Sequence, residues 1–157
     1  MKQRFGLALT AAVLGLPAPP FLAAQSAADS AGIRAAALDY IEGWYTGDTT
    51  RMTRALHPEL AKRIVQTDPK ARKSVLSQMG AKELIRYTRE GGGRDTPADR
   101  RQADVSILDI YQGAASAKVI AADWVDYLHL ARWNGRWMIV NVLWELKPKE
   151  ARGSRSP

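Results

Sequence analysis

The stretch Asp123-Trp-Val-Asp-Tyr-Leu-His-Leu-Ala-Arg-Trp-Asn-Gly-Arg-Trp-Met-Ile-Val-Asn-Val-Leu-Trp-Glu145 contains two segments rich in β-branched and aromatic residues, joined by Asn134-Gly135. Asn and Gly tolerate the positive φ angles that a two-residue type I′ turn requires, so this stretch predicts a β-hairpin. It holds four of the five tryptophans and one of the two histidines of the chain. The hairpin therefore decides the fold, and we expect any chemistry to lie near it.

A two-residue turn also fixes which residues of the two strands lie opposite one another. The predicted pairs are Leu130 with Ile139, Leu128 with Asn141, and Asp126 with Leu143. Because side chains alternate between the two faces of a strand, one face should carry Asp126, Leu128, Leu130, Trp137, Ile139, Asn141 and Leu143. The other should carry Tyr127, His129, Ala131, Trp133, Met138, Val140, Val142 and Trp144.

Both predicted faces are apolar, whereas a sheet that is wet on one side has one polar face. One face should therefore cover helices, and the other should contact a further partner. A second subunit is the simplest candidate, which predicts a homodimer through the sheet face. We expect His129 to have an interface or structural role.

The residues before the hairpin predict three helices. Apolar residues recur at helical spacing from Ile33 to Trp44, and Gly47 suits the end of this helix. Asp48 or Thr49 can start a second, short helix that stops near His57-Pro58. A third helix is predicted over residues 81–89, and the glycine run after it is expected to form a flexible loop. The segment from residue 60 to residue 67 fits either a short strand or a helical turn.

Residues 105–110 and 115–122 predict two more strands, separated by a turn at Gln112-Gly113. Together with the hairpin they form a meandering antiparallel sheet. The fold class is therefore α+β, with three N-terminal helices packed on one face of the sheet.

The N-terminal segment, residues 1–24, is typical of a secretory signal peptide: Lys2 and Arg4 precede an apolar stretch that ends at a small-residue site. This stretch is shorter than the roughly 20 residues that span a bilayer, so we expect cleavage, no stable membrane anchor, and a periplasmic or secreted location. Residues 25–32 should form a flexible lead-in to a single domain over residues 33–148. The basic segment 149–157 should form a disordered tail.

The composition limits the chemistry. The chain has no cysteine, which excludes thiol catalysis, and its two histidines show no metal-ligand spacing, so no metal site or cofactor is expected. The net charge of +7 is most simply explained by a solvated surface, and an exported protein meets little nucleic acid, so we expect no nucleic-acid partner.

The first hairpin face predicts a pocket. Leu128 and Ile139 would form its apolar floor, with Asp126 and Asn141 near one end, and the first helix would bring Tyr40 and Trp44 over it. Apolar walls with a few convergent polar groups are typical of small-molecule sites, although a filled core is the alternative.

Three segments then carry a resemblance: Tyr40-Ile-Glu-Gly-Trp-Tyr-Thr-Gly-Asp48, Ala55-Leu-His-Pro-Glu-Leu-Ala-Lys62, and the hairpin from Asp126 to Trp144. They resemble the lumazine-binding family of the nuclear transport factor 2-like (NTF2-like) superfamily. The resemblance implies a cone-shaped α+β fold with three helices over a curved antiparallel sheet, often dimeric through that sheet. It also implies a small aromatic or heterocyclic ligand, but the superfamily includes isomerases, dehydratases and cyclases as well as binders.

Three functions therefore stay open. A binding domain would use Tyr40 and Trp44 as flat contacts and Asp126 and Asn141 to orient polar edges of the ligand. A proton-transfer enzyme would need a base, for which Asp126, Asp123 or His57 is available, and a donor such as Tyr40 or Tyr45. A structural module would fill the cone and use only the sheet face.

Overall fold

The computed structural model describes residues 20–148, with side chains from residue 26 onward. These residues form three α-helices, α1 (Pro20–Thr46), α2 (Thr49–Ala55) and α3 (Ala81–Arg89), and one short 3₁₀-helix (Ala98–Arg100). Helix α1 starts before Ile33, so residues 25–32 are helical and do not form the predicted lead-in. The predicted signal peptide lies outside the described residues except for the helical backbone of residues 20–24, and the predicted tail at 149–157 lies wholly outside them. None of the described helices is long and apolar enough to cross a membrane.

Local sequence explains where the helices end. Gly47 has a φ of 71°, a left-handed conformation that costs glycine little, and it closes α1. Asp48 then caps α2, because its Oδ1 accepts hydrogen bonds from the backbone N–H groups of Thr50 and Arg51 at 2.9 and 3.0 Å. The predicted boundary between the two helices is therefore confirmed.

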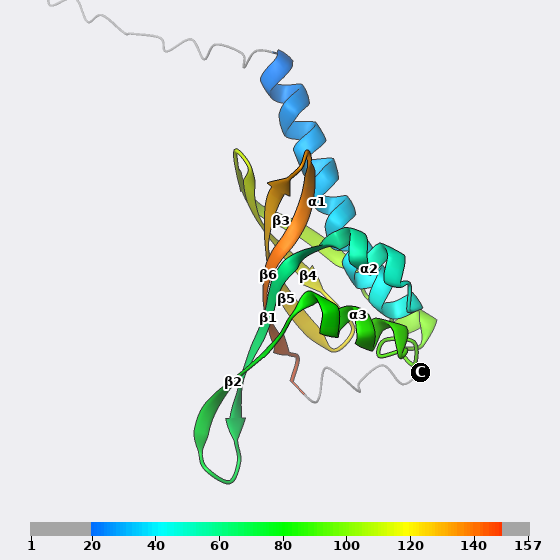
Figure 1. Ribbon diagram of the computed structural model, residues 1–157, viewed down its shortest axis with the longest axis vertical. Coiled ribbons are helices and arrows are strands. Elements are labelled where there is room, and N and C mark those ends of the chain that lie inside the picture. The colour runs from blue at the N-terminus through cyan, green and yellow to red at the C-terminus, as the bar shows by residue number, and fades with distance from the viewer. Residues whose placement is uncertain (1–19, 149–157) are drawn as a thin grey trace, which may run out of the picture.

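Six strands form one sheet in the order β2-β1-β6-β5-β4-β3 (Figure 1). Their bounds are β1 (Leu56–Asp68), β2 (Lys73–Met79), β3 (Asp104–Tyr111), β4 (Ala114–Ile120), β5 (Trp124–Trp133) and β6 (Arg136–Leu146). All neighbours are antiparallel except β1 and β6, which run parallel. The undecided segment 60–67 is thus a strand, and the β1–β2 hairpin lies between α2 and α3 in the chain. The helices lie on one side of the sheet, and the β1–β2 hairpin projects beyond it.

The predicted turn at Asn134-Gly135 is present, with φ angles of 49° and 81°. The predicted pairing holds as far as Leu130 and Ile139 and is wrong beyond them. There the register shifts by one residue, so that His129 pairs with Asn141 and Leu128 with Val142. A β-bulge at Val140 causes the shift, because an extra residue in one strand reverses the alternation of every side chain after it.

The bulge changes the composition of the two faces of the hairpin. Val142 and Trp144 join Leu128 and Asp126 on the helix side, while Asn141 and Leu143 move to the outer face. The outer face exposes Tyr127 and Leu143 by about half, next to Lys118 and Arg63. It is therefore more polar than predicted. The homodimer through this face stays a prediction.

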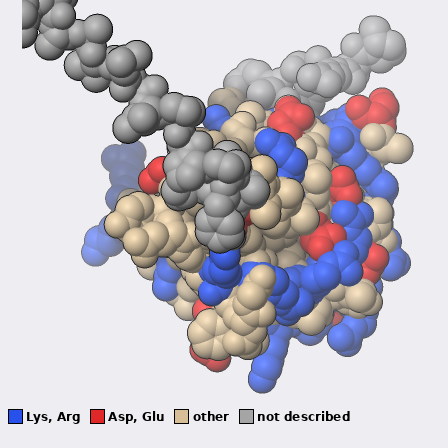
Figure 2. All heavy atoms as spheres, turned by 90° about the horizontal axis from the view of Figure 1, so that it is seen from above, with Lys and Arg blue, Asp and Glu red and all other residues tan. Residues whose placement is uncertain are grey.

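The surface charge is mixed on the side of the molecule seen from above. Figure 2 shows Asp and Glu side chains lying among the Lys and Arg side chains there. The face seen in Figure 2 consequently has no uniform positive field. Pairing of opposite charges also links α1 to α2, where Arg51 and Arg54 both form ion pairs with Asp39.

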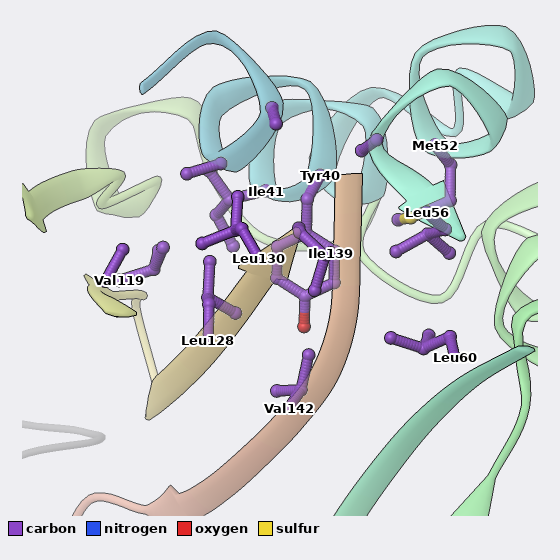
Figure 3. Close-up of a cluster of buried hydrophobic side chains, with 14 of the residues drawn as sticks. Tyr40, Ile41, Met52, Leu56, Leu60, Val119, Leu128, Leu130, Ile139 and Val142 are labelled. Carbon is purple, nitrogen blue, oxygen red and sulfur yellow. The ribbon is translucent and has the colours of Figure 1, made fainter. Parts of the chain in front are cut away.

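The hydrophobic core fills the space between the helices and the sheet. Fully buried side chains come from α1 (Ile33, Ile41), α2 (Met52), β4 (Val119), β5 (Leu128, Leu130) and β6 (Ile139, Val142). Figure 3 shows the Tyr40 ring among these side chains, with its hydroxyl group directed away from α1. A buried hydroxyl needs hydrogen-bond partners, and these partners define the candidate site.

Candidate ligand-binding site

Tyr40, Lys62 and Asp126 form a buried polar cluster at the end of the core. The Lys62 Nζ donates hydrogen bonds to the Tyr40 hydroxyl oxygen at 2.7 Å and to Asp126 Oδ1 at 2.6 Å. The Tyr40 hydroxyl donates in turn to Asp126 Oδ2 at 3.1 Å. The side chain of Lys62 is 8% exposed and that of Asp126 is fully buried. An ion pair this deeply buried needs such geometry to offset the loss of hydration.

Trp124 completes the cluster, because its indole Nε1 donates to Asp126 Oδ2 at 2.6 Å. The carboxylate thus accepts three hydrogen bonds from three side chains. Lysine has three N–H donors, and the third N–H of Lys62 has no partner among the described residues. Lys62 is therefore the one member of the cluster with a free donor, while both oxygens of Asp126 already accept hydrogen bonds.

Burial shifts the pKa values of Tyr40 and Lys62 in opposite directions. It raises the pKa of Tyr40 well above its usual value, and the neighbouring Asp126 carboxylate raises this pKa further. It lowers the pKa of Lys62 below its usual value, although Asp126 acts in the opposite direction. Removal from water disfavours the charged form of each group. Tyr40 consequently keeps its proton, whereas Lys62 releases one more readily than an exposed lysine does.

A cavity of about 230 Å³ opens directly above this cluster. Nine residues from two helices and four strands line it: Tyr40, Trp44, Lys62, Met79, Leu84, Tyr87, Trp124, Trp144 and Leu146. Five of them are aromatic, and Lys62 is the only charged one. Its Nζ lies 4.8 Å from the centre of the Trp144 ring, within the range of a cation–π contact. The cavity is thus an aromatic pocket with an ammonium group in its wall.

The glycine run after α3 shapes one wall of this aromatic pocket. A Cβ atom added to Gly92 or Gly93 would lie 2.5 or 2.4 Å from the Trp44 ring, which is closer than any side chain allows. The chain there packs directly on Trp44, which also makes an edge-to-face contact with Trp124 at 6.5 Å. The run is therefore a packing surface for a pocket residue, rather than only the flexible loop that we predicted.

Two larger hollows of about 400 and 480 Å³ lie near the hairpin turn. Arg136 lines both, but neither contains a member of the buried polar cluster. In the first, Arg132 and Arg54 already form ion pairs with Asp29 and Asp39. The aromatic pocket is therefore the stronger candidate.

The comparisons with known proteins agree with this architecture. A family model described as "Putative lumazine-binding" matches residues 28–145, which is most of the chain. The chain belongs to this family. A search of the curated proteins found no significant match.

Solved structures show that this chain has the NTF2-like fold. An NTF2-like protein of unknown function from Methylobacillus flagellatus is 24% identical, with a TM-score of 0.61 over 77% of this chain and 94% of that chain. One from Shewanella baltica is 20% identical, with a TM-score of 0.59 over 78% and 97%. An NTF2-like protein from Novosphingobium aromaticivorans, described as having a cystatin-like fold, is 14% identical, with a TM-score of 0.60 over 91% and 100%. The predicted α+β fold class is thereby confirmed.

In the structure of this lumazine-binding family member, the predicted ligand residues lie in three different places. Tyr40 and Trp44 line the aromatic pocket, and Asp126 lies beneath it. Leu128 and Ile139 are buried in the core and do not line the pocket. Asn141 lies on the outer face, where it accepts a hydrogen bond from Arg63 at 2.8 Å and contacts His129 at 3.2 Å. The bulge at Val140 is the reason that Asn141 and Asp126 are separated.

The candidate catalytic residues are not brought together. Asp123 forms an ion pair with Arg100 at 3.0 Å, with both side chains about one-third exposed. The ring of His57 packs against Trp133 at 4.8 Å, and its Nδ1 accepts a hydrogen bond from the Glu59 backbone N–H. Neither residue lines the aromatic pocket. Within residues 26–148, moreover, no group of three or more acidic or histidine side chains could hold a metal ion.

Tyr45 has a structural role at the end of α1. Its hydroxyl donates to the Gln102 carbonyl and accepts from the Ala122 backbone N–H, both at 2.9 Å. These bonds connect α1 to the segments before β3 and before β5. Both hydrogen-bonding directions of the hydroxyl are used, so Tyr45 is not a free donor.

Of the nine residues that line the pocket, the sequence predicted only Tyr40 and Trp44, and the most consequential omissions are Lys62 and Trp144. Lys62 was not predicted because segment 60–67 was not recognised as a strand. In β1 the buried residues alternate as Leu60, Lys62 and Ile64, so a period of two would have placed a lysine at a core position, which marks a functional candidate. Trp144 was assigned to the wrong face because of the bulge.

Replacing Tyr40 with Phe should change the dependence of stability on alkaline pH. The native pKa of Tyr40 lies above the value of about 10 for an unfolded chain. The part of the free energy of unfolding that depends on protonated Tyr40 is fully present below about pH 10. It is lost as the pH rises from there through the native pKa. Urea unfolding between about pH 8 and 11 should therefore show a steeper alkaline loss for the wild type than for Y40F. If the free energy of unfolding had the same pH dependence in the wild type and in Y40F, Tyr40 would not be the group with the raised pKa.

Proposed function

We propose that this lumazine-binding family member binds a small, flat, electrically neutral heterocycle in the aromatic pocket. The observation that supports this proposal is a free lysine N–H in an otherwise aromatic and apolar wall. Trp44, Trp124 and Trp144 offer ring faces to a planar ligand, and Lys62 offers a hydrogen bond to an acceptor atom at its edge.

Two properties of the pocket narrow the ligand class. Its volume of about 230 Å³ lies below the roughly 300–1,000 Å³ of pockets that hold drug-sized ligands, which suits one or two fused rings. The ammonium of Lys62 is already paired with the Asp126 carboxylate. An anionic ligand would therefore meet a second negative charge close behind the lysine, and a neutral carbonyl edge fits better. Lumazine, a two-ring heterocycle with carbonyl edges, meets both conditions.

A proton-transfer enzyme is less well supported by this geometry. The nine described residues that line the pocket include no carboxylate and no histidine. Asp126 is nearest, but its two oxygens accept bonds from Lys62, Tyr40 and Trp124. A general base must reach the proton that it removes, and Asp126 faces the cluster instead. Binding is therefore the function that we propose, in the exported, dimeric setting that the sequence predicts.

Isothermal titration calorimetry with lumazine tests the proposal, using two tryptophan variants. Trp144→Leu removes a ring from the pocket wall and should weaken binding about 5- to 150-fold, which corresponds to the roughly 1–3 kcal/mol measured for stacking of one base. Trp133→Leu removes a half-exposed ring from the neighbouring strand β5, outside the pocket, and should leave the affinity unchanged. Circular dichroism should show that both variants are folded.

Two calorimetric results would contradict the proposal. Equal affinities for the two variants would mean that lumazine binds elsewhere on the surface. Absence of heat for the wild type with lumazine and with other neutral two-ring heterocycles would mean that the pocket is not a binding site for this class.

A further inference from the structure

The amine of Lys62 is suited to more than donating one hydrogen bond to a ligand, because it can also act as a nucleophile. It is the only amine among the nine described residues that line the aromatic pocket, and its Nζ has one free N–H. A hydroxyl group and a carboxylate lie within 2.7 Å of it. An amine next to a proton acceptor and a proton relay, in an apolar cavity, is the arrangement in which lysine reacts with carbonyl compounds.

We propose that Lys62 forms a Schiff base with small aromatic aldehydes that enter the aromatic pocket. This inference rests on the pocket described under the proposed function, but it concerns a covalent reaction of one residue. The ligand class is an aldehyde attached to one or two flat rings, whose ring contacts Trp44, Trp124 and Trp144 and whose carbonyl carbon meets the Lys62 Nζ.

The proton route follows from the contacts of Lys62. The ammonium first gives a proton to Asp126 Oδ1, 2.6 Å away, which leaves a free amine. The nitrogen lone pair then attacks the carbonyl carbon, and the electron pair of the C=O bond moves to the oxygen. One N–H proton passes to this oxygen, with the Tyr40 hydroxyl at 2.7 Å from Nζ as the relay. The product of this step is a neutral carbinolamine.

Loss of water completes the reaction. The proton on Asp126 returns through the Tyr40 hydroxyl, which lines the pocket, to the carbinolamine hydroxyl. That hydroxyl leaves as water, while the nitrogen lone pair forms the C=N bond. In sum, one ammonium and one aldehyde give one protonated imine and one water. No oxidant or reductant is needed.

The buried surroundings of Lys62 favour this reaction in two ways. The protonated imine has the same positive charge as the ammonium, so the ion pair with Asp126 and the contact with the Trp144 ring persist in the product. The burial that lowers the pKa of Lys62 also makes its free amine more available at neutral pH than that of an exposed lysine.

Reductive trapping of the full chain with benzaldehyde and sodium cyanoborohydride at about pH 7.5 tests this inference. Peptide mapping by mass spectrometry locates the benzyl group. We expect Lys62 to be labelled faster than exposed Lys82 in the same digest, because burial lowers the pKa of Lys62 and leaves more of it as free amine at this pH. Lys62→Arg keeps the charge and removes the nucleophile, so labelling of the peptide that contains residue 62 should disappear.

A competition experiment in the wild type keeps the inference testable if Lys62→Arg does not fold. Excess lumazine should slow labelling of Lys62 and leave labelling of Lys82 unchanged. Labelling of Lys82 with none at Lys62, while calorimetry still shows lumazine binding, would overturn the Schiff base and leave the proposed function intact. Selective labelling of Lys62 without lumazine binding would support the reactive amine and overturn the proposed ligand. Equal labelling of all lysines would overturn the inference.

Discussion

Replacing Asp126 with Leu should lower the free energy of unfolding by about 3–5 kcal/mol, because it leaves the Lys62 ammonium buried without its partner. Leu is larger than Asp, so the substitution leaves no cavity, and the double variant described below separates the lost charge from any overpacking. Tyr40 and Trp124 would also lose their acceptor. For a domain of this size the melting temperature should fall by roughly 10–20 °C, which thermal unfolding followed by circular dichroism measures directly.

Two further variants separate the buried ion pair from other effects. Asp123→Leu removes an acid three residues earlier in the chain, from a partly exposed ion pair with Arg100, and should cost less than about 1 kcal/mol. In the double variant Lys62→Met/Asp126→Leu no charge is left unpaired, and more than half of the lost stability should return. A double variant as unstable as the single one would show that Asp126 acts through its packing or its neutral hydrogen bonds.

Leu128→Ala should cost about 2–5 kcal/mol, as expected for truncation of a large side chain in a close-packed core. Leu128 is 1% exposed and lies among fully buried residues of α1 and β6 (Figure 3). It does not line the aromatic pocket, so the variant should bind lumazine with unchanged affinity at a temperature where it is folded. Urea unfolding and calorimetry on the same preparation measure both quantities.

Leu143→Ala is the matched control for this variant. The residue type and the substitution are the same, but Leu143 is 50% exposed and pairs with Tyr127 on the outer face of the sheet. Its truncation should change stability by less than about 0.5 kcal/mol. Similar losses for the two variants would mean that the outer face is covered in solution, as the predicted homodimer requires.

The elements of this fold whose signals are local could be predicted from the sequence. Gly47 followed by Asp48 ends one helix and caps the next, and Asn134-Gly135 makes the hairpin turn. In each case a few adjacent residues determine the backbone conformation. The family resemblance is confirmed for the same reason, since it rests on those segments.

The candidate site could be predicted only in part, because its geometry depends on a non-local feature. Tyr40, Trp44 and Asp126 come together as expected, but the bulge at Val140 exchanges Asn141 for Val142 on the inner face. No turn or cap residue marks that bulge, and the alternation of apolar residues fits either register. Lys62 depends on the parallel pairing of β1 with β6, which joins segments far apart in the sequence.

The buried pair of Lys62 and Asp126 also constrains how this pocket can evolve. Neither residue can be exchanged for an apolar one alone without leaving an uncompensated charge in the interior, so the two positions are coupled although they lie on different strands. A lineage can change the chemistry of the pocket by a step through neutral polar residues, or by two substitutions that become established together. Homologues of this chain should therefore carry both charges or neither.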